Sequence, residues 1–265
     1  MALTDKRLFL LDMDGTIYLD DMLFNGVLEF LDHVKVIGGR CMYLTNNSSK
    51  SVDKYIEKMA SLGIPAVEED FFTSTNATVL HLKKSHTKSL IYALGTASFK
   101  EQLRAGGLDV TSSFCDGIDC LVAGFDTELT FQKLEDACIL LSRGVDFIAT
   151  NPDWICPTWY GYVPDCGSVC EMLFRATGRR PVFIGKPQPE MALLAIEKSG
   201  FYKDEALLVG DRIYTDIACG VNAGISTALV LSGETTREVL NESEVMPEYV
   251  FDDINALLAA IRKHV

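Results

Sequence analysis

The stretch RLFLLDMDGT, residues 7–16, decides how the rest of the chain is arranged. Four consecutive apolar residues, Leu8 to Leu11, predict a strand that is buried on both faces of a parallel sheet. Two carboxylates, a glycine and a threonine follow at once, so this strand delivers acidic groups to the carboxyl edge of the sheet. Open α/β sheets bind their ligands at that edge.

Asp12 and Asp14 are two residues apart, so in an extended chain both side chains project to the same side. Two carboxylates on one side repel each other unless a cation lies between them. Mg²⁺ prefers hard oxygen ligands and usually binds one or two protein carboxylates together with water and substrate phosphate. Because Asp-Gly is also a common turn dipeptide, this stretch taken alone is equally compatible with an acidic turn after a strand.

The composition narrows the class of protein. The chain has 265 residues, 48% of them hydrophobic, which is enough for one large domain and a smaller inserted one. A net charge of −13 disfavours nucleic acid or an anionic membrane surface as a partner, and no apolar run approaches the length of a transmembrane helix.

The eight cysteines form no C-x-x-C pair and the start lacks the features of a signal peptide, so we expect a reduced, cytoplasmic protein. The four histidines show no tight ligand spacing, which disfavours zinc.

Helix and strand patterns alternate along the whole chain. In the first part, strands are predicted over 8–11, 41–44 and 71–74, and helices over 27–34, 52–62 and 76–84. Residues 89–180 have an alternation of their own, with strands over 90–94, 120–123 and 146–150, a loop at 151–167 and a helix at 169–176. The first pattern resumes with strands over 182–184, 206–209, 227–231 and 249–251 and helices over 189–199, 217–223 and 254–261.

This order predicts an α/β fold with an insertion. We expect a doubly wound, Rossmann-like parallel sheet formed by residues 1–80 and 181–265, which would be the catalytic core domain. Residues 81–180 would form an inserted, smaller α/β cap domain that selects the substrate.

Four polar clusters fall at strand ends or helix starts of the predicted core sheet: Asp12/Asp14, Thr45/Asn46, Lys186 and Asp211/Asp216. Taken singly, Lys186 is more often a solvated loop lysine, and Asp216 a carboxylate at a helix N-terminus. Together they supply the parts of a phosphoryl transfer. A carboxylate that attacks a phosphate dianion needs a metal and a cation near the transferring oxygens, and a second acid must protonate the leaving oxygen.

These motifs resemble those of the haloacid-dehalogenase-like hydrolase superfamily, in which Asp-x-Asp-Gly-Thr is followed by Thr or Ser, then Lys, then Gly-Asp with a further Asp. This chain has them in that order, at residues 12–16, 45–46, 186, 210–211 and 216. It is further similar to the type IIA subfamily (NagD-like, para-nitrophenylphosphatase) through segments 124–131, 150–153 and 176–179. One departure is Pro164-Asp165-Cys166-Gly167, where many relatives have Pro-Gly-x-Gly near the substrate, and it bears on substrate identity.

The resemblance implies a phosphoric monoester hydrolase, similar to 4-nitrophenylphosphatase, that depends on Mg²⁺ and forms an aspartyl-phosphate intermediate. It implies three catalytic residues: Asp12 as nucleophile, Asp14 as acid and base, and Lys186. For the metal it implies the Asp12 carboxylate, the Asp14 carbonyl, Asp211, and Asp216 in support. For the phosphoryl group it implies Thr45, Asn46 and Lys186. Within the 151–167 loop, we predict that Asn151, Asp153 and Trp159 bind the substrate.

Several alternatives use the same residues. A dehalogenase of the superfamily would lack the second Asp of the first motif, so Asp14 favours phosphate over carbon chemistry. A phosphomutase or phosphotransferase would keep the whole set. A phosphate-sensing protein with little turnover would lack Asp12 or Asp14, and both are present. The expected partner is a small phosphate ester of a nucleotide, sugar or aryl group, and a homodimer through the cap is left open.

Overall fold

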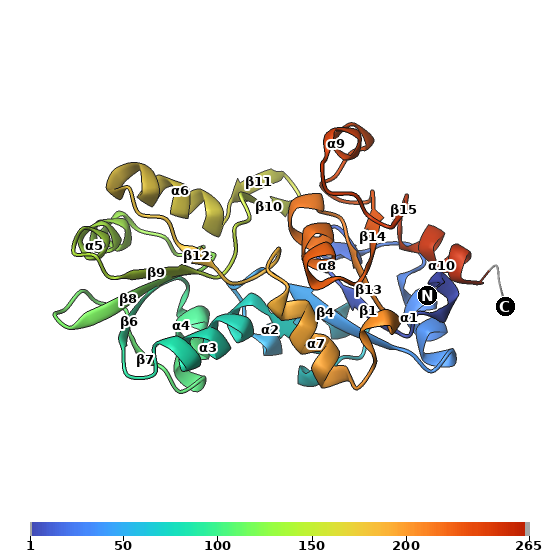
Figure 1. Ribbon diagram of the computed structural model, residues 1–265, viewed down its shortest axis with the longest axis horizontal. Coiled ribbons are helices and arrows are strands. Elements are labelled where there is room, and N and C mark those ends of the chain that lie inside the picture. Colours follow the sequence, from blue (N-terminus) through green and yellow to red (C-terminus); the bar gives the residue numbers. More distant parts are fainter. Residues whose placement is uncertain (1, 263–265) are drawn as a thin grey trace.

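The computed structural model describes residues 2–262 and contains two parallel sheets that lie side by side, each flanked by helices (Figure 1). The predicted α/β fold is therefore confirmed. The ends of the predicted core domain, residue 1 and residues 263–265, lie outside the described residues. Within 2–262, no helix is both long and apolar enough to cross a membrane.

The larger sheet has six strands, and β1 (Leu8–Leu11) lies near its centre. Its strand order is β15 (Tyr249–Phe251), β14 (Ser226–Val230), β13 (Ala206–Gly210), β1, β4 (Arg40–Thr45) and β5 (Phe71–Thr73). Every neighbouring pair is parallel. The chain passes from β1 to β4 on one side and from β13 to β14 on the other, so the direction of winding reverses between β1 and β13. Ligands of doubly wound sheets bind at such a reversal.

The side chains of β1 alternate between two apolar clusters, as a strand buried on both faces requires. Phe9 and Leu11 pack in one cluster with α1 (Val27–Val36), α2 (Val52–Ser61) and α10 (Ile254–Arg262). Leu8 and Leu10 pack in the other with α3 (Ser74–Ser85), α7 (Glu190–Ser199) and α8 (Ala218–Ala223). The latter cluster continues into the second sheet through Ile91 and Val122, so one apolar core joins the two sheets.

The smaller sheet has five parallel strands in the order β12 (Val182–Phe183), β9 (Asp146–Ala149), β8 (Ile118–Ala123), β6 (Leu90–Leu94) and β7 (Asp109–Thr111). Its helices are α4 (Ala97–Ala105), α5 (Phe131–Ser142) and α6 (Cys166–Thr177). The strand at 182–183 was expected to return the chain to the first sheet, and this expectation is wrong because β12 pairs with β9. A two-residue apolar strand carries no signal for which sheet it joins. The domain boundaries at 80 and 181 stay predictions.

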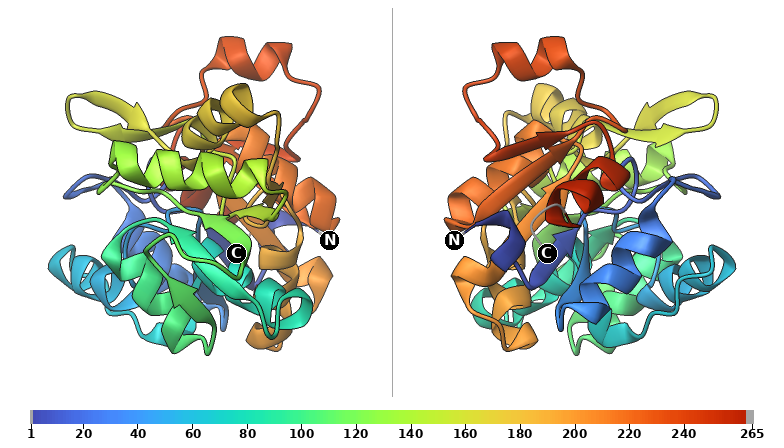
Figure 2. Two further views of the ribbon diagram at one scale, coloured as in Figure 1. Left: turned by 90° about the vertical axis from the view of Figure 1, so that its left-hand side faces the viewer. Right: turned by 90° about the vertical axis from the view of Figure 1, so that its right-hand side faces the viewer.

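The segment expected to be a loop at 151–167 contains an antiparallel hairpin, β10 (Ile155–Thr158) and β11 (Gly161–Pro164). In Figure 2 this hairpin, in yellow, projects from the body of the molecule. The sequence pattern did not predict this hairpin, because proline and glycine are uncommon inside strands and the hairpin contains both. Smaller elements that the sequence did not predict are β2 (Tyr18–Leu19), β3 (Met22–Leu23), α9 (Arg237–Glu242), a π-helical turn at Ile213–Ile217 and 3₁₀ turns at Leu3–Asp5, Glu68–Asp70 and Lys203–Glu205.

Candidate active site

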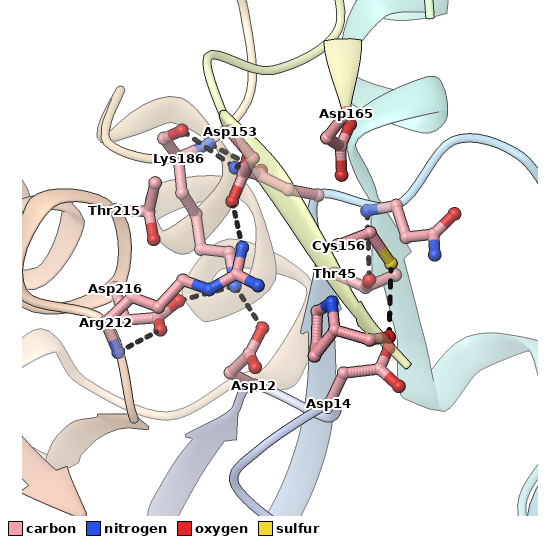
Figure 3. Close-up of a pocket in the computed structure, with 13 residues that line it drawn as sticks. Asp12, Asp14, Thr45, Asp153, Cys156, Asp165, Lys186, Arg212, Thr215 and Asp216 are labelled. Atoms are coloured by element: carbon pink, nitrogen blue, oxygen red, sulfur yellow. Dashed lines mark hydrogen bonds and ion pairs between the residues drawn. The ribbon is translucent and has the colours of Figure 1, made fainter. Parts of the chain in front are cut away.

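One small cavity lies between the two sheets, and side chains from all four predicted polar clusters line it (Figure 3). The Asp211/Asp216 cluster contributes only Asp216 to this lining. Segment 151–167 of the cap also contributes side chains. The cavity has a volume of about 30 Å³. That is space for a few water molecules, far less than the volume of a typical ligand pocket. The cap therefore sits tightly on the core. The charged residues that line the cavity are Asp12, Asp14, Asp153, Asp165, Asp216, Lys186 and Arg212.

Three carboxylates are placed to share a metal ion. Oxygens of Asp12, Asp211 and Asp216 all lie within 4.8 Å of one another, at the ends of β1 and β13 and in the π-helical turn. Burial raises the pKa of Asp12 well above its ordinary range, and burial with the Asp216 charge raises the pKa of Asp211 to about 7. These shifts report a crowded group of carboxylates whose charges are incompletely balanced by the protein. An all-oxygen donor set of this kind fits a hard divalent cation.

Gly15 allows this group to form. Its φ angle is +88°, and a Cβ atom there would lie 2.6 Å from Asp211 Oδ2. Any other residue would be strained in this conformation and would push into the carboxylate. Thr16 Oγ1 then donates a hydrogen bond to Asp211 Oδ1 at 3.3 Å. The Asp-Gly-Thr part of the motif thus shapes the backbone around Asp211.

Lys186 is the buried cation beside the predicted nucleophile. Its Nζ donates to Asp12 Oδ1 at 2.5 Å and to the Leu44 carbonyl at 3.0 Å, and it forms an ion pair with Asp216 Oδ1 at 2.6 Å. Burial opposes the charge of this ammonium, but Asp12 and Asp216 outweigh burial and raise the pKa of Lys186. Lys186 therefore stays protonated next to Asp12.

Asp14, the predicted acid and base, lies at the rim of the same cavity, and 27% of its side chain is exposed. Lys58 Nζ lies 3.8 Å from Asp14 Oδ1 and 3.7 Å from the centre of the Tyr18 ring. Burial raises the pKa of Asp14 above its ordinary value, while Lys58 opposes that rise. Lys58 comes from α2, and nothing in the sequence pattern distinguished it from other lysines on that helix.

Thr45 and Asn46, which were predicted to bind the phosphoryl group, both line the cavity. The side-chain amide of Asn46, however, makes its hydrogen bonds to other residues of the protein. Its Nδ2 donates to Asp153 Oδ2 at 2.7 Å and to the Lys186 carbonyl at 2.9 Å, and its Oδ1 accepts from the Lys186 backbone N–H. Asn46 thus positions the Lys186 loop and the cap segment. Thr45 Oγ1 accepts from the Asn47 N–H at 3.1 Å and faces the cavity.

The three cap residues predicted to bind substrate lie in three different places. Asp153 lines the cavity, and Asp165 lines it as well. Asn151 lies behind them, because its Nδ2 donates to Asp153 Oδ2 at 2.9 Å and to Asp165 Oδ1 at 3.1 Å. Trp159 is at the tip of the β10–β11 hairpin with 83% of its surface exposed, and it does not line the cavity. The predicted contact between Trp159 and the substrate therefore stays a prediction.

Arg212 is the residue that the sequence did not predict. Its guanidinium forms a buried ion pair with Asp153 of the cap, and its Nε lies 2.7 Å from Glu234 Oε2 without hydrogen-bond geometry. Because Asp153 lies after β9 and Arg212 after β13, this pair connects the cap to the core. Its only sequence signal is that it directly follows Asp211, and adjacency does not reveal the contact with Asp153.

Removing one partner of this buried pair should destabilise the protein. Asp153→Ala leaves the Arg212 guanidinium with Glu234 alone and removes the acceptor of two amide groups, from Asn46 and Asn151. We expect the free energy of unfolding to fall by about 3 kcal/mol, because a buried ion pair is lost and two buried amide N–H groups lose their acceptor. Urea unfolding followed by circular dichroism measures the change.

The chain offers a matched control in Asp252, which forms an ion pair with Arg237 on the surface, where 75% of the Asp252 side chain is exposed. Asp252→Ala should cost less than about 1 kcal/mol, because exposed ion pairs contribute little. If both substitutions lower the free energy of unfolding by the same small amount, the Asp153–Arg212 pair does not hold the cap on the core.

Two family models match the chain. The model described as haloacid dehalogenase-like hydrolase covers residues 9–109, and a HAD-hydrolase-like model covers residues 183–257. The acid sugar phosphatase of Staphylococcus aureus is 34% identical over 257 residues, which are 97% of this chain and 98% of that protein.

Solved structures agree with this result. The 4-nitrophenylphosphatase of Thermotoga maritima aligns with a TM-score of 0.91 and 41% identity, over 98% of this chain and 99% of that one. The glycerol phosphate phosphatase of Mycobacterium tuberculosis, solved with magnesium, aligns with a TM-score of 0.89 and 29% identity, over 97% of this chain and 78% of that one. NagD from Escherichia coli K-12 aligns with a TM-score of 0.83 and 28% identity, over 94% of this chain and 97% of that one. The chain belongs to the haloacid dehalogenase-like hydrolase family, in its NagD-like branch with a type IIA cap.

Proposed function

We propose that this protein is a Mg²⁺-dependent phosphatase that hydrolyses small phosphomonoesters through a phosphorylated Asp12. The observation that carries the proposal is the surroundings of Asp12. The Lys186 ammonium lies 2.5 Å from Asp12 Oδ1, and Asp211 and Asp216 complete a group of carboxylates within 4.8 Å. These distances support Asp12 as the nucleophile, Lys186 as a fixed cation and the three carboxylates as metal ligands. The names of the relatives, acid sugar phosphatase and 4-nitrophenylphosphatase, support hydrolysis of small phosphate esters.

In the first step an Asp12 carboxylate oxygen attacks phosphorus. A bond forms between that oxygen and phosphorus, and the bond from phosphorus to the ester oxygen breaks. Lys186 stabilises charge on the transferring oxygens, because its ammonium is already fixed in place by Asp12 and Asp216. Asp14 donates its proton to the leaving oxygen, so the alcohol departs neutral.

In the second step water hydrolyses the phosphorylated Asp12. Asp14, now a carboxylate, accepts a proton from water as its oxygen bonds to phosphorus, and the bond between phosphorus and the Asp12 oxygen breaks. Inorganic phosphate leaves, and both aspartates return to their starting forms. The Asp14 side chain is 27% exposed, so it can be reached both by the leaving group and by water.

The residues that would hold Mg²⁺ through carboxylates are Asp12, Asp211 and Asp216. The resemblance to the family adds the Asp14 carbonyl. When bound there, the ion neutralises charge on Asp12 and on the phosphoryl oxygens, so that two anions can approach. The similar glycerol phosphate phosphatase was solved with magnesium and with calcium, which supports a divalent cation at this site. We also infer a cytoplasmic location, which the eight free cysteine thiols support.

Metal removal tests the proposal directly. With 4-nitrophenyl phosphate and a panel of sugar and nucleotide monophosphates, we expect turnover in millimolar Mg²⁺ and a loss of at least about tenfold in excess EDTA, because the carboxylate charges are then unbalanced. Adding Mg²⁺ back should restore the rate. Full activity in EDTA would contradict the metal requirement.

A phosphomutase or phosphotransferase would use the same residues, and the panel separates it from a phosphatase. A mutase would move phosphate between positions of one sugar and release little inorganic phosphate. A phosphate-binding sensor would bind the esters without turnover. The absence of nucleic-acid and membrane partners and a homodimer through the cap stay predictions.

A further inference from the structure

We propose that Ser48 and Thr150 are positioning residues, whose hydroxyl groups hold the cap on the core in the arrangement that the reaction needs. The inference rests on the proposed phosphatase function, because it assigns the two residues to that reaction. Neither side chain lines the active-site cavity, so both act through other residues. The basis of the inference is a series of buried hydrogen bonds that runs from Ser48 to the active site.

The two hydroxyl groups meet where the cap joins the core. Ser48 lies in the loop between β4 and α2 of the core, and Thr150 directly follows β9 of the cap. Their oxygens are 3.0 Å apart, and both residues have 0% of their surface exposed. Ser48 Oγ also accepts the N–H of Phe125, which follows β8 in the cap, at 2.8 Å. One hydroxyl group of the core therefore binds two segments of the cap.

The direction of these hydrogen bonds follows from the groups that make them. Thr150 Oγ1 donates to Asn151 Oδ1 at 2.6 Å, because an amide oxygen can only accept. This bond uses the Thr150 hydroxyl proton, so Ser48 is the donor in its bond to Thr150. Asn151 Nδ2 then donates to Asp153 Oδ2 at 2.9 Å and to Asp165 Oδ1 at 3.1 Å. This relay, formed by Ser48, Thr150 and Asn151, thus ends on two carboxylates that line the cavity.

From Asp153 the contacts continue to the cation beside the predicted nucleophile. Asp153 Oδ2 also accepts from Asn46 Nδ2 at 2.7 Å, and Asn46 Oδ1 accepts the Lys186 N–H at 2.9 Å. The Lys186 ammonium lies 2.5 Å from Asp12 Oδ1. A rotation of the Asn151 amide would therefore loosen the support of both Asp153 and the Lys186 loop. A displacement of about 1 Å in such groups can lower a rate by about a hundredfold.

Two glycines make room for the relay. A Cβ atom at Gly124 would lie 2.9 Å from Ser48 Oγ, and a Cβ atom at Gly185 would lie 2.5 Å from the Thr150 carbonyl oxygen. Both distances are shorter than a normal contact, so a side chain at either position would displace the relay. Gly124 begins the segment 124–131, which resembles the type IIA subfamily, and the relay gives this segment a role at the site.

Replacing the Thr150 hydroxyl group tests the proposal. Thr150→Val keeps the shape of the side chain but has no hydroxyl group, so Asn151 loses its donor and Ser48 loses its acceptor. We expect kcat/KM for 4-nitrophenyl phosphate in Mg²⁺ to fall by at least about tenfold. Thr150→Ser keeps the hydroxyl group and loses only a buried methyl group, so it should stay close to the wild-type rate.

The midpoint of thermal unfolding separates positioning from a merely structural role. Both Thr150 variants lose buried contacts and should unfold at a lower temperature, so a structural role predicts that both also lose activity. The matched control is Thr227→Val in β14, where a threonine that is 2% exposed accepts the Glu248 N–H at 3.1 Å. This variant loses a buried hydroxyl group far from the relay. It should unfold at a lower temperature and keep the wild-type kcat/KM.

Ser48→Ala interrupts the relay at its other end and should lower kcat/KM by a similar factor. Residues that act as one unit give losses that do not add. The double variant Ser48→Ala/Thr150→Val should therefore lose no more activity than the more affected single variant. Circular dichroism checks that each variant folds, and if Thr150→Val does not fold, Ser48→Ala decides the test.

The outcomes separate this inference from the proposed function. If the wild-type protein hydrolyses no phosphate ester in Mg²⁺, the phosphatase function fails and the inference fails with it. If the wild-type protein is active and the folded relay variants keep its rate, only the inference is overturned. The same holds if Thr150→Ser or Thr227→Val loses as much activity as Thr150→Val, because the loss would then follow stability and not the hydroxyl group.

Discussion

Asp12→Asn should lower kcat/KM for 4-nitrophenyl phosphate by on the order of 10⁵-fold, the scale of losing a covalent nucleophile. The amide has nearly the shape of the carboxylate, but it is not a nucleophile. It also carries no charge to balance Lys186, whose ammonium lies 2.5 Å from Asp12 Oδ1. Steady-state rates with purified variant and wild-type protein measure the loss. Mass spectrometry of acid-quenched wild-type enzyme should detect phosphate on the peptide that contains Asp12.

The control is the same substitution at a surface aspartate of the core. Asp32→Asn fits this purpose, because 79% of the Asp32 side chain is exposed and its one ion pair is 4.0 Å long. That variant should keep the wild-type rate. Persistent activity in Asp12→Asn, or phosphate found on another residue, would contradict the assignment of Asp12 as the nucleophile.

Asp14→Asn should lower activity by an amount that depends on the leaving group. With an alkyl phosphate we expect a loss on the order of a hundredfold or more, because a poor leaving group needs its proton. With an aryl phosphate the loss should be smaller, since a phenolate departs with little protonation. Steady-state kcat/KM for glycerol 1-phosphate and 4-nitrophenyl phosphate gives the comparison.

In the proposed mechanism Asp14 also activates water in the second step, and this second role brings the two losses closer together. Single-turnover measurement of alcohol release isolates the first step, where the difference between the esters must appear. Lys58→Met is a useful companion variant, because it removes the only cation within 4.0 Å of Asp14 among residues 2–262 and leaves the carboxylate in place. Equal losses on both esters in the single-turnover experiment would argue against Asp14 as the proton donor.

The sequence alone was sufficient for the fold class, and it predicted which residues meet at the core site. Buried parallel strands are nearly continuous apolar runs, and residues 8–11 and 206–209 are such runs. Their carboxyl ends must share an edge in a parallel sheet, which brings Asp12 and Asp211 together without knowledge of any side-chain position. Lys186 could be assigned because the order of the motifs resembles that of a known family.

Other features depended on contacts between segments far apart in the chain. Arg212 pairs with Asp153 over 59 positions, and Asn46 with the Lys186 loop over 140. Lys58 reaches Asp14 from α2, and β12 joins the sheet of the cap although its sequence suits either sheet. For Trp159 the sequence suggested a position in the pocket, because the residue is aromatic. The structure instead places it on the hairpin, where 83% of its surface is exposed.

The difference has a physical cause. Strand and helix periodicity, and the shared edge of a parallel sheet, follow from local backbone geometry, so a single sequence contains them. Which residue pairs with a buried charge between cap and core depends on how these two units pack against each other. No local sequence pattern encodes this packing. The sequence therefore determined a phosphoryl-transfer core on a doubly wound sheet. Only the tertiary structure decided which residues join the cap to the core and which acidic groups line the cavity.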